Sequence, residues 1–229
     1  MPRLDQLVAR NLGCSRTQAR RLLDAHDARR EVAQAELPLR FELPAGPIEL
    51  HDVFHLALNK PAGLVTALHD PVHRTVRELV RDAPLYGELR PAGRLDMDTT
   101  GLLIWTSDGT WLHKITHPRS RIPRTYHAAL ARPFRRPGSE LALADGHRPE
   151  ISELSLIDAG RAHPSLDRPA QAQAYATITI VGGAYHEVRR IFAALDSHVL
   201  ALCRVRFGKL ALPDDLALGA WAPISPLDV

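Results

Sequence analysis

Cysteine, lysine and long apolar segments are all scarce in this chain of 229 residues. Its two cysteines, Cys14 and Cys203, lie far apart without a CxxC motif, which argues against a disulfide scaffold and against a zinc cluster. No apolar run approaches the roughly 18–20 residues needed to cross a bilayer. The first ten residues, MPRLDQLVAR, place an acid and two arginines where a signal peptide would be apolar. We therefore expect a cytosolic protein.

The positive charge is carried almost entirely by arginine, with 26 Arg against 3 Lys. A GC-rich genome produces such a bias without any function. The placement is more informative, because residues 109–139 contain seven basic residues and no Asp or Glu, and residues 1–30 contain seven Arg against three acids. Arginine binds phosphate through two nitrogens and stacks on bases, so the two blocks favour a nucleic-acid footprint.

The first 30 residues have the pattern of a basic helical hairpin. Leu4, Leu7, Val8 and Leu12 fall on one helical face, and Gly13 stands where that helix would end. A capping box, S-x-x-Q at 15–18, opens a second helix. In this second helix we expect an inward face and an outward face, formed respectively by Ala19, Leu22 and Leu23 and by Arg16, Arg20 and Arg21.

Prolines and glycines interrupt the pattern from about residue 31 to residue 52, so we place a domain boundary there. The expected division is a small helical module over residues 1–50 and a second domain over residues 51–229. With 45% hydrophobic residues, the chain can close one medium core with such an appendage.

Strands dominate after the boundary, often with one strand following another. We expect strands at 54–59, 102–105, 125–131, 150–157, 174–181 and 199–207, and helices after Thr75, after Gly109 and at 185–195. This order predicts an α+β domain with a mixed, largely antiparallel sheet rather than a doubly wound fold.

The segment GRLDMDTTGLLIWTSDG, residues 93–109, has the highest density of candidate functional residues. Its two aspartates before a buried strand are compatible with a simple capped turn. They also match the D-x-D-x-T string of haloacid-dehalogenase-like phosphatases, in which a carboxylate attacks phosphorus beside magnesium. That motif follows a buried apolar strand, however, and here LRPAG precedes it.

A third interpretation rests on four segments in one order: LNKPAG at 58–63, GRLDMDTTGLL at 93–103, RTY at 124–126 and YHEVRRIFAAL at 185–195. Together they resemble the RsuA family of ribosomal RNA pseudouridine synthases, and the run TSDGTWLHKITHPR resembles the small-subunit type. The N-terminal hairpin resembles the αL RNA-binding domain of these enzymes. A strand turn of the type V-x-V-N-G, expected after its second helix, is missing before residue 52, which predicts a trimmed module.

The resemblance implies roles for individual residues. Asp96 would be the nucleophilic carboxylate, and Arg189 the cation that pairs with it. Tyr126 would stack on the uracil, while Arg94 would fill the space left by the flipped nucleotide. Leu212 would line the base pocket. The remaining assignments are Asp98 as an acceptor that shapes the loop, His186 as a structural residue, and Arg16, Arg20 and Arg21 as RNA contacts.

The sequence thus predicts an enzyme that isomerises a uridine of ribosomal RNA, of the small subunit, to pseudouridine. Because the reaction changes neither mass nor redox state, we expect no cofactor, and no histidine pattern predicts a metal site. The expected partner is ribosomal RNA or a ribosome-assembly particle, with no membrane association and a monomeric protein. The alternative is a non-catalytic RNA-binding or ribosome-assembly protein on the same fold.

Overall fold

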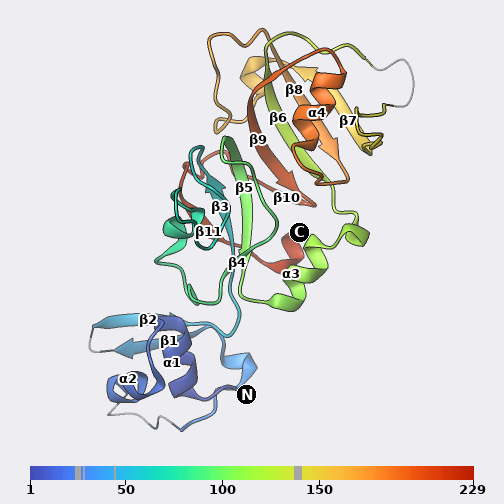
Figure 1. The fold of residues 1–229 in the computed structure, drawn as a ribbon. Coiled ribbons are helices and arrows are strands. Elements are labelled where there is room, and N and C mark those ends of the chain that lie inside the picture. Colours follow the sequence, from blue (N-terminus) through green and yellow to red (C-terminus); the bar gives the residue numbers. More distant parts are fainter. Residues whose placement is uncertain (24–26, 28, 44, 137–140) are drawn as a thin grey trace.

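The computed structural model describes residues 1–229 except 24–26, 28, 44 and 137–140. A small N-terminal body is joined to a larger body that is built on one long mixed sheet (Figure 1). Most strand pairs in this sheet are antiparallel, and strands often follow one another with helices interspersed, so the predicted α+β class is confirmed. Within the described residues, every helix is too short or too polar to span a bilayer.

The N-terminal body consists of the helices α1 (Leu4–Leu12) and α2 (Arg16–Leu22) and an antiparallel hairpin of β1 (Leu39–Leu43) and β2 (Gly46–Leu50). These elements enclose a core of their own. The sequence predicted both helices but not the hairpin. Its strands have half-buried and exposed residues in alternation, which is a weak signal in a short segment rich in proline.

Local chemistry explains where the two helices begin and end. Gly13 adopts a left-handed φ of 63° and closes α1, as the sequence predicts. Ser15 accepts a hydrogen bond from the backbone N–H of Gln18, whose side chain bonds back to Ser15 in the predicted capping box. Two predicted core positions are wrong, because Leu12 and Leu22 are 42% and 38% exposed. The body is too small to cover the last turn of either helix.

A buried carboxylate orders the basic face of this body. Asp5 is fully buried and accepts ion pairs from Arg3, Arg16 and Arg20, at 3.2, 3.4 and 2.8 Å. The outward orientation of the α2 arginines is therefore only partly correct, since two of them reach back to Asp5. Arg21 is exposed and makes no ion pair with any other described residue.

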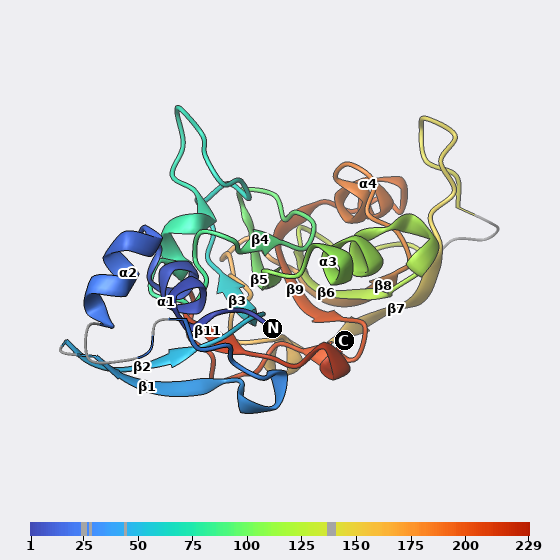
Figure 2. The same cartoon turned by 90° about the horizontal axis from the view of Figure 1, so that it is seen from below.

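The sheet of the larger body has the strand order β11-β3-β5-β9-β6-β8-β7, with β4 added on β5 and β10 on β9. Its strands, in chain order, are β3 (His55–Lys60), β4 (Arg90–Pro91), β5 (Thr99–Thr106), β6 (Arg124–Leu130), β7 (Ile151–Ile157), β8 (Ala174–Ile180), β9 (Val199–Phe207), β10 (Leu210–Ala211) and β11 (Trp221–Pro223). Figure 2 shows the N-terminal body at the end of the sheet near β3 and β11, with β7 at the other end. The predicted strands are confirmed.

Both faces of this sheet are covered. One face packs under α4 (Glu187–Ala194) and the short 3-10 helix at Val76–Val80, and the other packs under α3 (Gly109–Thr116). Alternate residues of β5 enter the two cores, Leu103 in the first and Leu102 in the second. A strand buried on both faces reads as a continuous apolar run, which is why LLIW is uninterrupted.

The two halves of the sheet meet where β5 runs parallel to β9. Gly101 lies opposite Arg204 in this ladder and adopts a φ of 101°. A Cβ at position 101 would lie 2.3 Å from the carbonyl oxygen of Arg204, so only glycine allows this approach. The close contact fixes the start of β5, and with it the preceding aspartate loop, against the middle of β9.

The buried carboxylate of the N-terminal body gives a test of stability. Burial alone would raise the pKa of Asp5, but the hydrogen bond from Arg20 and the nearby arginine charges hold that pKa below its usual value. Asp5→Asn should lower the free energy of unfolding of this body by about 2 kcal/mol at pH 7, less than for a fully buried pair because the arginines are half exposed. Denaturant titration monitored within the N-terminal body measures this difference.

The pH dependence has a definite sign. A carboxyl group with a lowered folded pKa contributes stability above its unfolded pKa of about 3.9, and this contribution is lost as the pH falls through the folded value. The difference between the wild type and Asp5→Asn should therefore shrink below about pH 4. Glu42→Gln, on the exposed side of β1, is the matched control and should leave stability unchanged. Equal stability of Asp5→Asn and wild type at pH 7 would contradict the assignment.

Candidate active site

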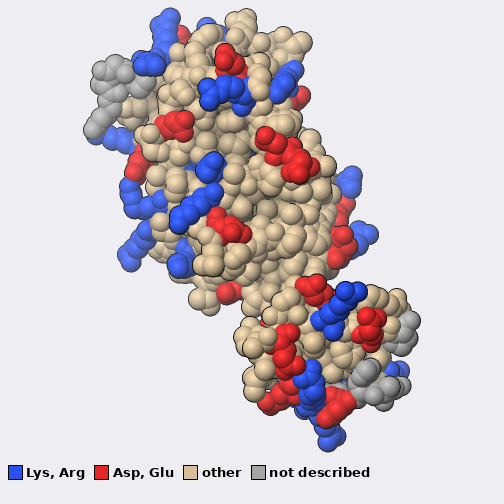
Figure 3. Space-filling view, turned by 180° about the vertical axis from the view of Figure 1, so that it is seen from behind, with Lys and Arg blue, Asp and Glu red and all other residues tan. Residues whose placement is uncertain are grey.

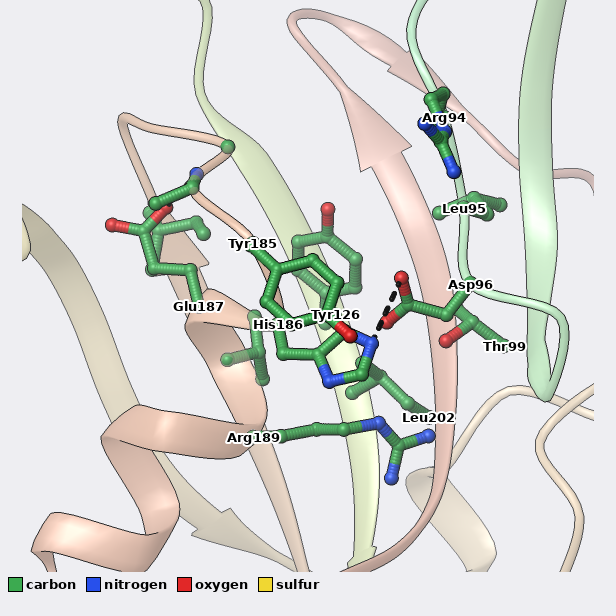
Figure 4. Close-up of a pocket in the computed structure, with 14 residues that line it drawn as sticks. Arg94, Leu95, Asp96, Thr99, Tyr126, Tyr185, His186, Glu187, Arg189 and Leu202 are labelled. Atoms are coloured by element: carbon green, nitrogen blue, oxygen red, sulfur yellow. Dashed lines mark hydrogen bonds and ion pairs between the residues drawn. The ribbon is translucent and has the colours of Figure 1, made fainter. Parts of the chain in front are cut away.

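A cavity of about 350 Å³ opens beside the loop that precedes β5 (Figure 4). Its wall includes Tyr126 of β6, Leu202 of β9 and the residues that begin α4. Three residues with predicted catalytic roles, Asp96, Tyr126 and Arg189, all line this cavity, and Arg94 lies at its edge with them. The fold therefore brings together side chains from three separated segments of the chain.

A buried lysine holds the aspartate loop from below. Lys60, at the end of β3, is fully buried, and its Nζ donates hydrogen bonds to the carbonyl oxygens of Pro61, Met97 and Thr99, at 3.0, 3.2 and 2.8 Å. The loop is closed by a further hydrogen bond from the N–H of Thr99 to the carbonyl of Asp96. The ammonium thus supplies the carbonyls of this short turn with the hydrogen bonds that a helix or a sheet would otherwise supply.

The same lysine places a positive charge under the two carboxylates. Burial lowers the pKa of Lys60 to about 8, although Asp98 and Asp96 both act in the opposite direction. At neutral pH the side chain is therefore still an ammonium. Lys60 was not among the predicted site residues, because its signal in the sequence is slight: it is one of only three lysines and precedes a turn with Pro and Gly.

The carboxylate of Asp96 faces the cavity and remains about one third exposed. The imidazole of His186 lies beside it, with Nε2 3.6 Å from Oδ1 of Asp96. The ring of Tyr185 stacks on that of His186, with centroids 3.9 Å apart, and is 78% exposed. His186, which the sequence analysis assigned to a structural role, therefore belongs to the cavity wall and orients toward the candidate nucleophile.

The predicted pairing of Arg189 with Asp96 is not what the structure contains. Nη2 of Arg189 lies 2.9 Å from Oδ2 of Asp98, in an ion pair without hydrogen-bond geometry, while Nη1 donates to the carbonyl of Val199. Asp98 is thus an ion-pair partner rather than only a loop-shaping acceptor. Arg190 leaves the cavity and pairs with Asp145.

The register of α4 separates its two adjacent arginines. The residues Val188, Ile191, Phe192 and Leu195 form a buried stripe. Arg189 extends along the edge of this stripe into the cavity, and Arg190 does not line it. Helical period places a side chain on a face, but it cannot decide which of two aspartates in a turn the side chain meets. The error therefore concerns only the partner.

Leu212 does not line the described cavity, contrary to the prediction. It is buried in the core on the opposite face of the sheet, while Leu202 of β9 provides the apolar wall near Tyr126. Leu212 follows the turn at Gly208 and the short strand β10, which folds back on β9. The role of Leu212 was implied by the resemblance, and strand alternation could not test it across this turn. Tyr126 itself is 8% exposed, so its ring is almost enclosed by the cavity wall.

A buried carboxylate shapes the loop before α4. Glu187 is 4% exposed, and its Oε2 accepts a hydrogen bond from the N–H of Ala184 while Oε1 lies 2.8 Å from Nε2 of His147. A Cβ at Gly182 would meet this carboxylate at 2.7 Å. Glu187 therefore fixes the strand-to-helix loop that carries Tyr185 and His186. The adjacent glycines at 182–183 were the available signal.

The turn with the two aspartates comes before a buried strand, not after one. This is the reverse of the order that the phosphatase motif requires. Across the part of the chain that the structure describes, no three His, Cys, Asp or Glu side chains are grouped as metal ligands. The α2 arginines Arg16, Arg20 and Arg21 lie in the N-terminal body and do not line this cavity.

Comparison with known proteins gives a consistent result. The family model described as RNA pseudouridylate synthase matches residues 55–194. The chain is 34% identical to ribosomal small subunit pseudouridine synthase A of Yersinia pestis, over 99% of this chain and 96% of that protein. It is also 34% identical to the protein of the same name from Escherichia coli strain K12, over 99% and 98%. A solved structure described as a pseudouridylate synthase aligns over 100% of this chain and 98% of its own, with a TM-score of 0.61 and 27% identity.

Because Lys60 is buried, we expect the free energy of unfolding to rise with pH above about pH 8. The folded pKa of Lys60, about 8, lies below the unfolded value of about 10.4, so the unfolded state holds more protons between these values. The free energy of unfolding of the wild type, relative to that of Lys60→Met, should therefore rise by about 2 kcal/mol between pH 8 and pH 10.

Lys209→Met, which replaces an exposed lysine, should follow the wild-type pH profile and serves as the control. Denaturant titrations at several pH values measure all three proteins. A flat difference between wild type and Lys60→Met would show that Lys60 is not buried as an ammonium.

Proposed function

Because this chain belongs to the RNA pseudouridylate synthase family, we propose that it converts a specific uridine of small-subunit ribosomal RNA to pseudouridine. The observation that supports this most strongly is the 34% identity to two small-subunit synthases over nearly the full chain. The cavity around Asp96 supplies the chemistry. As an RNA pseudouridine synthase, the protein is an isomerase.

The reaction breaks the bond from N1 of uracil to C1′ of ribose and forms a bond from C5 to C1′. The proton leaves C5 and N1 gains one, so mass and redox state are unchanged and no cofactor is needed. Asp96 faces the cavity and serves as the nucleophile, holding one fragment while the base turns. The turn that contains Asp96 keeps its position during this step, because the ammonium of Lys60 donates hydrogen bonds to the carbonyls of Met97 and Thr99.

The enclosing residues bind and orient the base. The ring of Tyr126 lies in the cavity wall, where it can stack on the uracil and assist the departure of the C5 proton. A volume of about 350 Å³ accommodates one nucleotide and no duplex, so the uridine has to leave its stack. Arg94, two residues before Asp96 at the cavity edge, occupies the vacated space in the RNA.

Arg189 sets the electrostatics of the pair of aspartates. Its guanidinium pairs with Asp98 and enters the same cavity as Asp96. Arg189 therefore keeps the site ionised when the RNA covers it and removes water.

The N-terminal body, residues 1–50, is an RNA-binding module in this proposal, and residues 51–229 form the catalytic domain. Arg16 and Arg20 are half exposed although they pair with Asp5, so their outer nitrogens can still contact phosphate. Substitution of Arg21 tests RNA binding by this module without a change in folding, because Arg21 is not part of the ion-pair cluster around Asp5. The protein acts as a monomer in the cytoplasm, away from membranes, on ribosomal RNA or on an assembly particle.

Exchange of the two aspartates for asparagine tests the choice of nucleophile. Asp96→Asn keeps size and hydrogen bonding but removes the nucleophile, so turnover should fall by at least about 10⁴-fold. Asp98→Asn should fall by about tenfold to a hundredfold, because it loses only the ion pair with Arg189. Pseudouridine mapping of ribosomal RNA, in a strain that lacks the gene and is complemented with each variant, measures both. Equal losses would show that the nucleophile is assigned wrongly, and a modified site restored by Asp96→Asn would contradict the mechanism.

The adjacent arginines of α4 provide a matched pair. Arg189→Met should lower kcat by about a hundredfold or more and move the acidic limb of the pH profile upward, because the carboxylates lose their cation. Arg190→Met removes the same charge outside the cavity, where it breaks only the pair with Asp145, and should change kcat less than about threefold. Single-turnover assays across pH distinguish them. If Arg190→Met were the inactive variant, the register of α4 would be wrong.

A further inference from the structure

A second cavity, of about 580 Å³, adjoins the first and has no role in the reaction described above. The two share Arg94, Tyr126 and the loop residues Gly183 and Ala184. The second cavity extends away from Asp96 toward the end of α3. Four arginines and no Asp or Glu are found among its described lining residues. This positively charged lining suits an anion better than a neutral base.

One of these arginines is buried with an unpaired nitrogen. Arg204 of β9 is 2% exposed, and its Nε donates to the carbonyl of Leu102 at 2.8 Å. Its Nη2, which is inaccessible to solvent, has no hydrogen-bond partner among the described residues. A buried guanidinium nitrogen without an acceptor costs free energy unless water or an anion accepts its hydrogen bond.

A second arginine, the partly buried Arg124, adds to the free-energy cost of burying positive charge in this cavity. Arg124, at the start of β6, donates to the carbonyls of Gly182 and Ile122, at 2.6 and 3.2 Å, and no carboxylate accepts from it among the described residues. Its guanidinium and that of Arg204 both lie over the ring of Phe207, at 5.0 and 5.5 Å from the centroid. The pKa of Arg124 is lowered by burial and also by the charge of Arg204.

The acidic side chains around Arg124 and Arg204 bind other partners. Glu187 acts on Arg124 electrostatically, but its carboxylate bonds Ala184 and His147. Arg121, another lining residue, pairs with Glu150 outside the cavity. The positive charge of Arg124 and Arg204 is therefore not neutralised by the described part of the protein, and an anion would stabilise the cavity.

The surroundings of the cavity are rich in basic residues. Thr116, His117 and Pro118, where α3 ends, line the cavity and belong to the segment 109–139, which contains seven basic residues and no acid. In Figure 3, Lys and Arg side chains gather along the left edge of the larger body, and the smaller body has both charges intermixed. A surface with an excess of positive charge attracts a polyanion.

We propose that the second cavity binds a backbone phosphodiester of the RNA next to the flipped uridine, with Arg204 and Arg124 as its ligands. The inference rests on the proposed function, since the shared wall at Tyr126 places this phosphate beside the nucleotide in the first cavity. Two guanidinium groups give the paired donors that a phosphate accepts. The site positions the strand and carries no base specificity.

Substitution of the two ligands tests the site on RNA. Arg204→Met and Arg124→Met should each raise KM about tenfold, the effect of one charge-assisted hydrogen bond. Each should also reduce the slope of log K against log salt by about 0.7–0.9, measured with a transcript of small-subunit ribosomal RNA. Arg206→Met is the matched control, because it removes one exposed arginine from the same strand outside the cavity. Equal changes in the control and the two variants would overturn the proposal.

Inorganic phosphate provides a second measurement that needs no activity. At equal ionic strength, phosphate should raise the Tm of the wild type and of Arg206→Met above the value in chloride, and this increment should be smaller in Arg124→Met. The control variant accounts for the general stabilisation by phosphate. If Arg204→Met does not fold, Arg124→Met and the phosphate titration still decide the question.

The outcomes separate this site from the proposed function. Wild-type protein that forms no pseudouridine in RNA or in assembly particles would refute the function, whatever phosphate does to the Tm. Normal turnover with unchanged KM in both arginine variants would refute the site alone. A phosphate effect on Tm without any effect on RNA binding would show a site for a free anion and would overturn the assignment to the RNA backbone.

Discussion

The ammonium of Lys60 is the interaction on which the geometry of the site depends. A turn with two carboxylates has no helix or sheet to hold it, and the charges repel each other. Two hydrogen bonds from Lys60, to the carbonyls of Met97 and Thr99, fix the path of this turn, and the positive charge offsets part of the repulsion. Because β3 ends at Lys60, the central sheet itself carries this support. A solvent-exposed cation could supply the charge but not the fixed direction of the bonds.

The secondary structure could largely be predicted from the sequence because the hydrophobic periods are strong. The run LLIW, the capping box at Ser15 and the apolar stripe of α4 each give a direct physical signal. The β1–β2 hairpin escaped prediction because its strands are only half buried. Asp96, Tyr126 and Arg189 were assigned through the resemblance, and the structure brings them to one cavity.

Both errors concern roles that the resemblance implied, and local period could not check them because it says nothing about partners across space. The cation next to Asp98 and the face that Leu212 occupies depend on how turns fold back. Counts of basic residues along the sequence likewise do not show which acids those residues pair with. The basic residues near the N-terminus surround a buried Asp5, whereas Arg124 of the 109–139 block donates to backbone carbonyls among the described residues. Similar counts of basic residues thus correspond to different pairings.

The parallel ladder between β5 and β9 divides the site between two mechanical units. Asp96 and Lys60 belong to the half that contains β3 and β5, while Tyr126 and Arg189 belong to the half that contains β6, β9 and α4. The backbone register pairs from Thr99 to Gly101 join the halves along this seam, and side chains cross it in the hydrogen bond from Arg204 to Leu102 and in the ion pair of Arg189 with Asp98. A shear along the seam would change the distance between Asp96 and Tyr126 while leaving the strands of each half intact. The alignment of the cavity therefore depends on how β5 packs against β9.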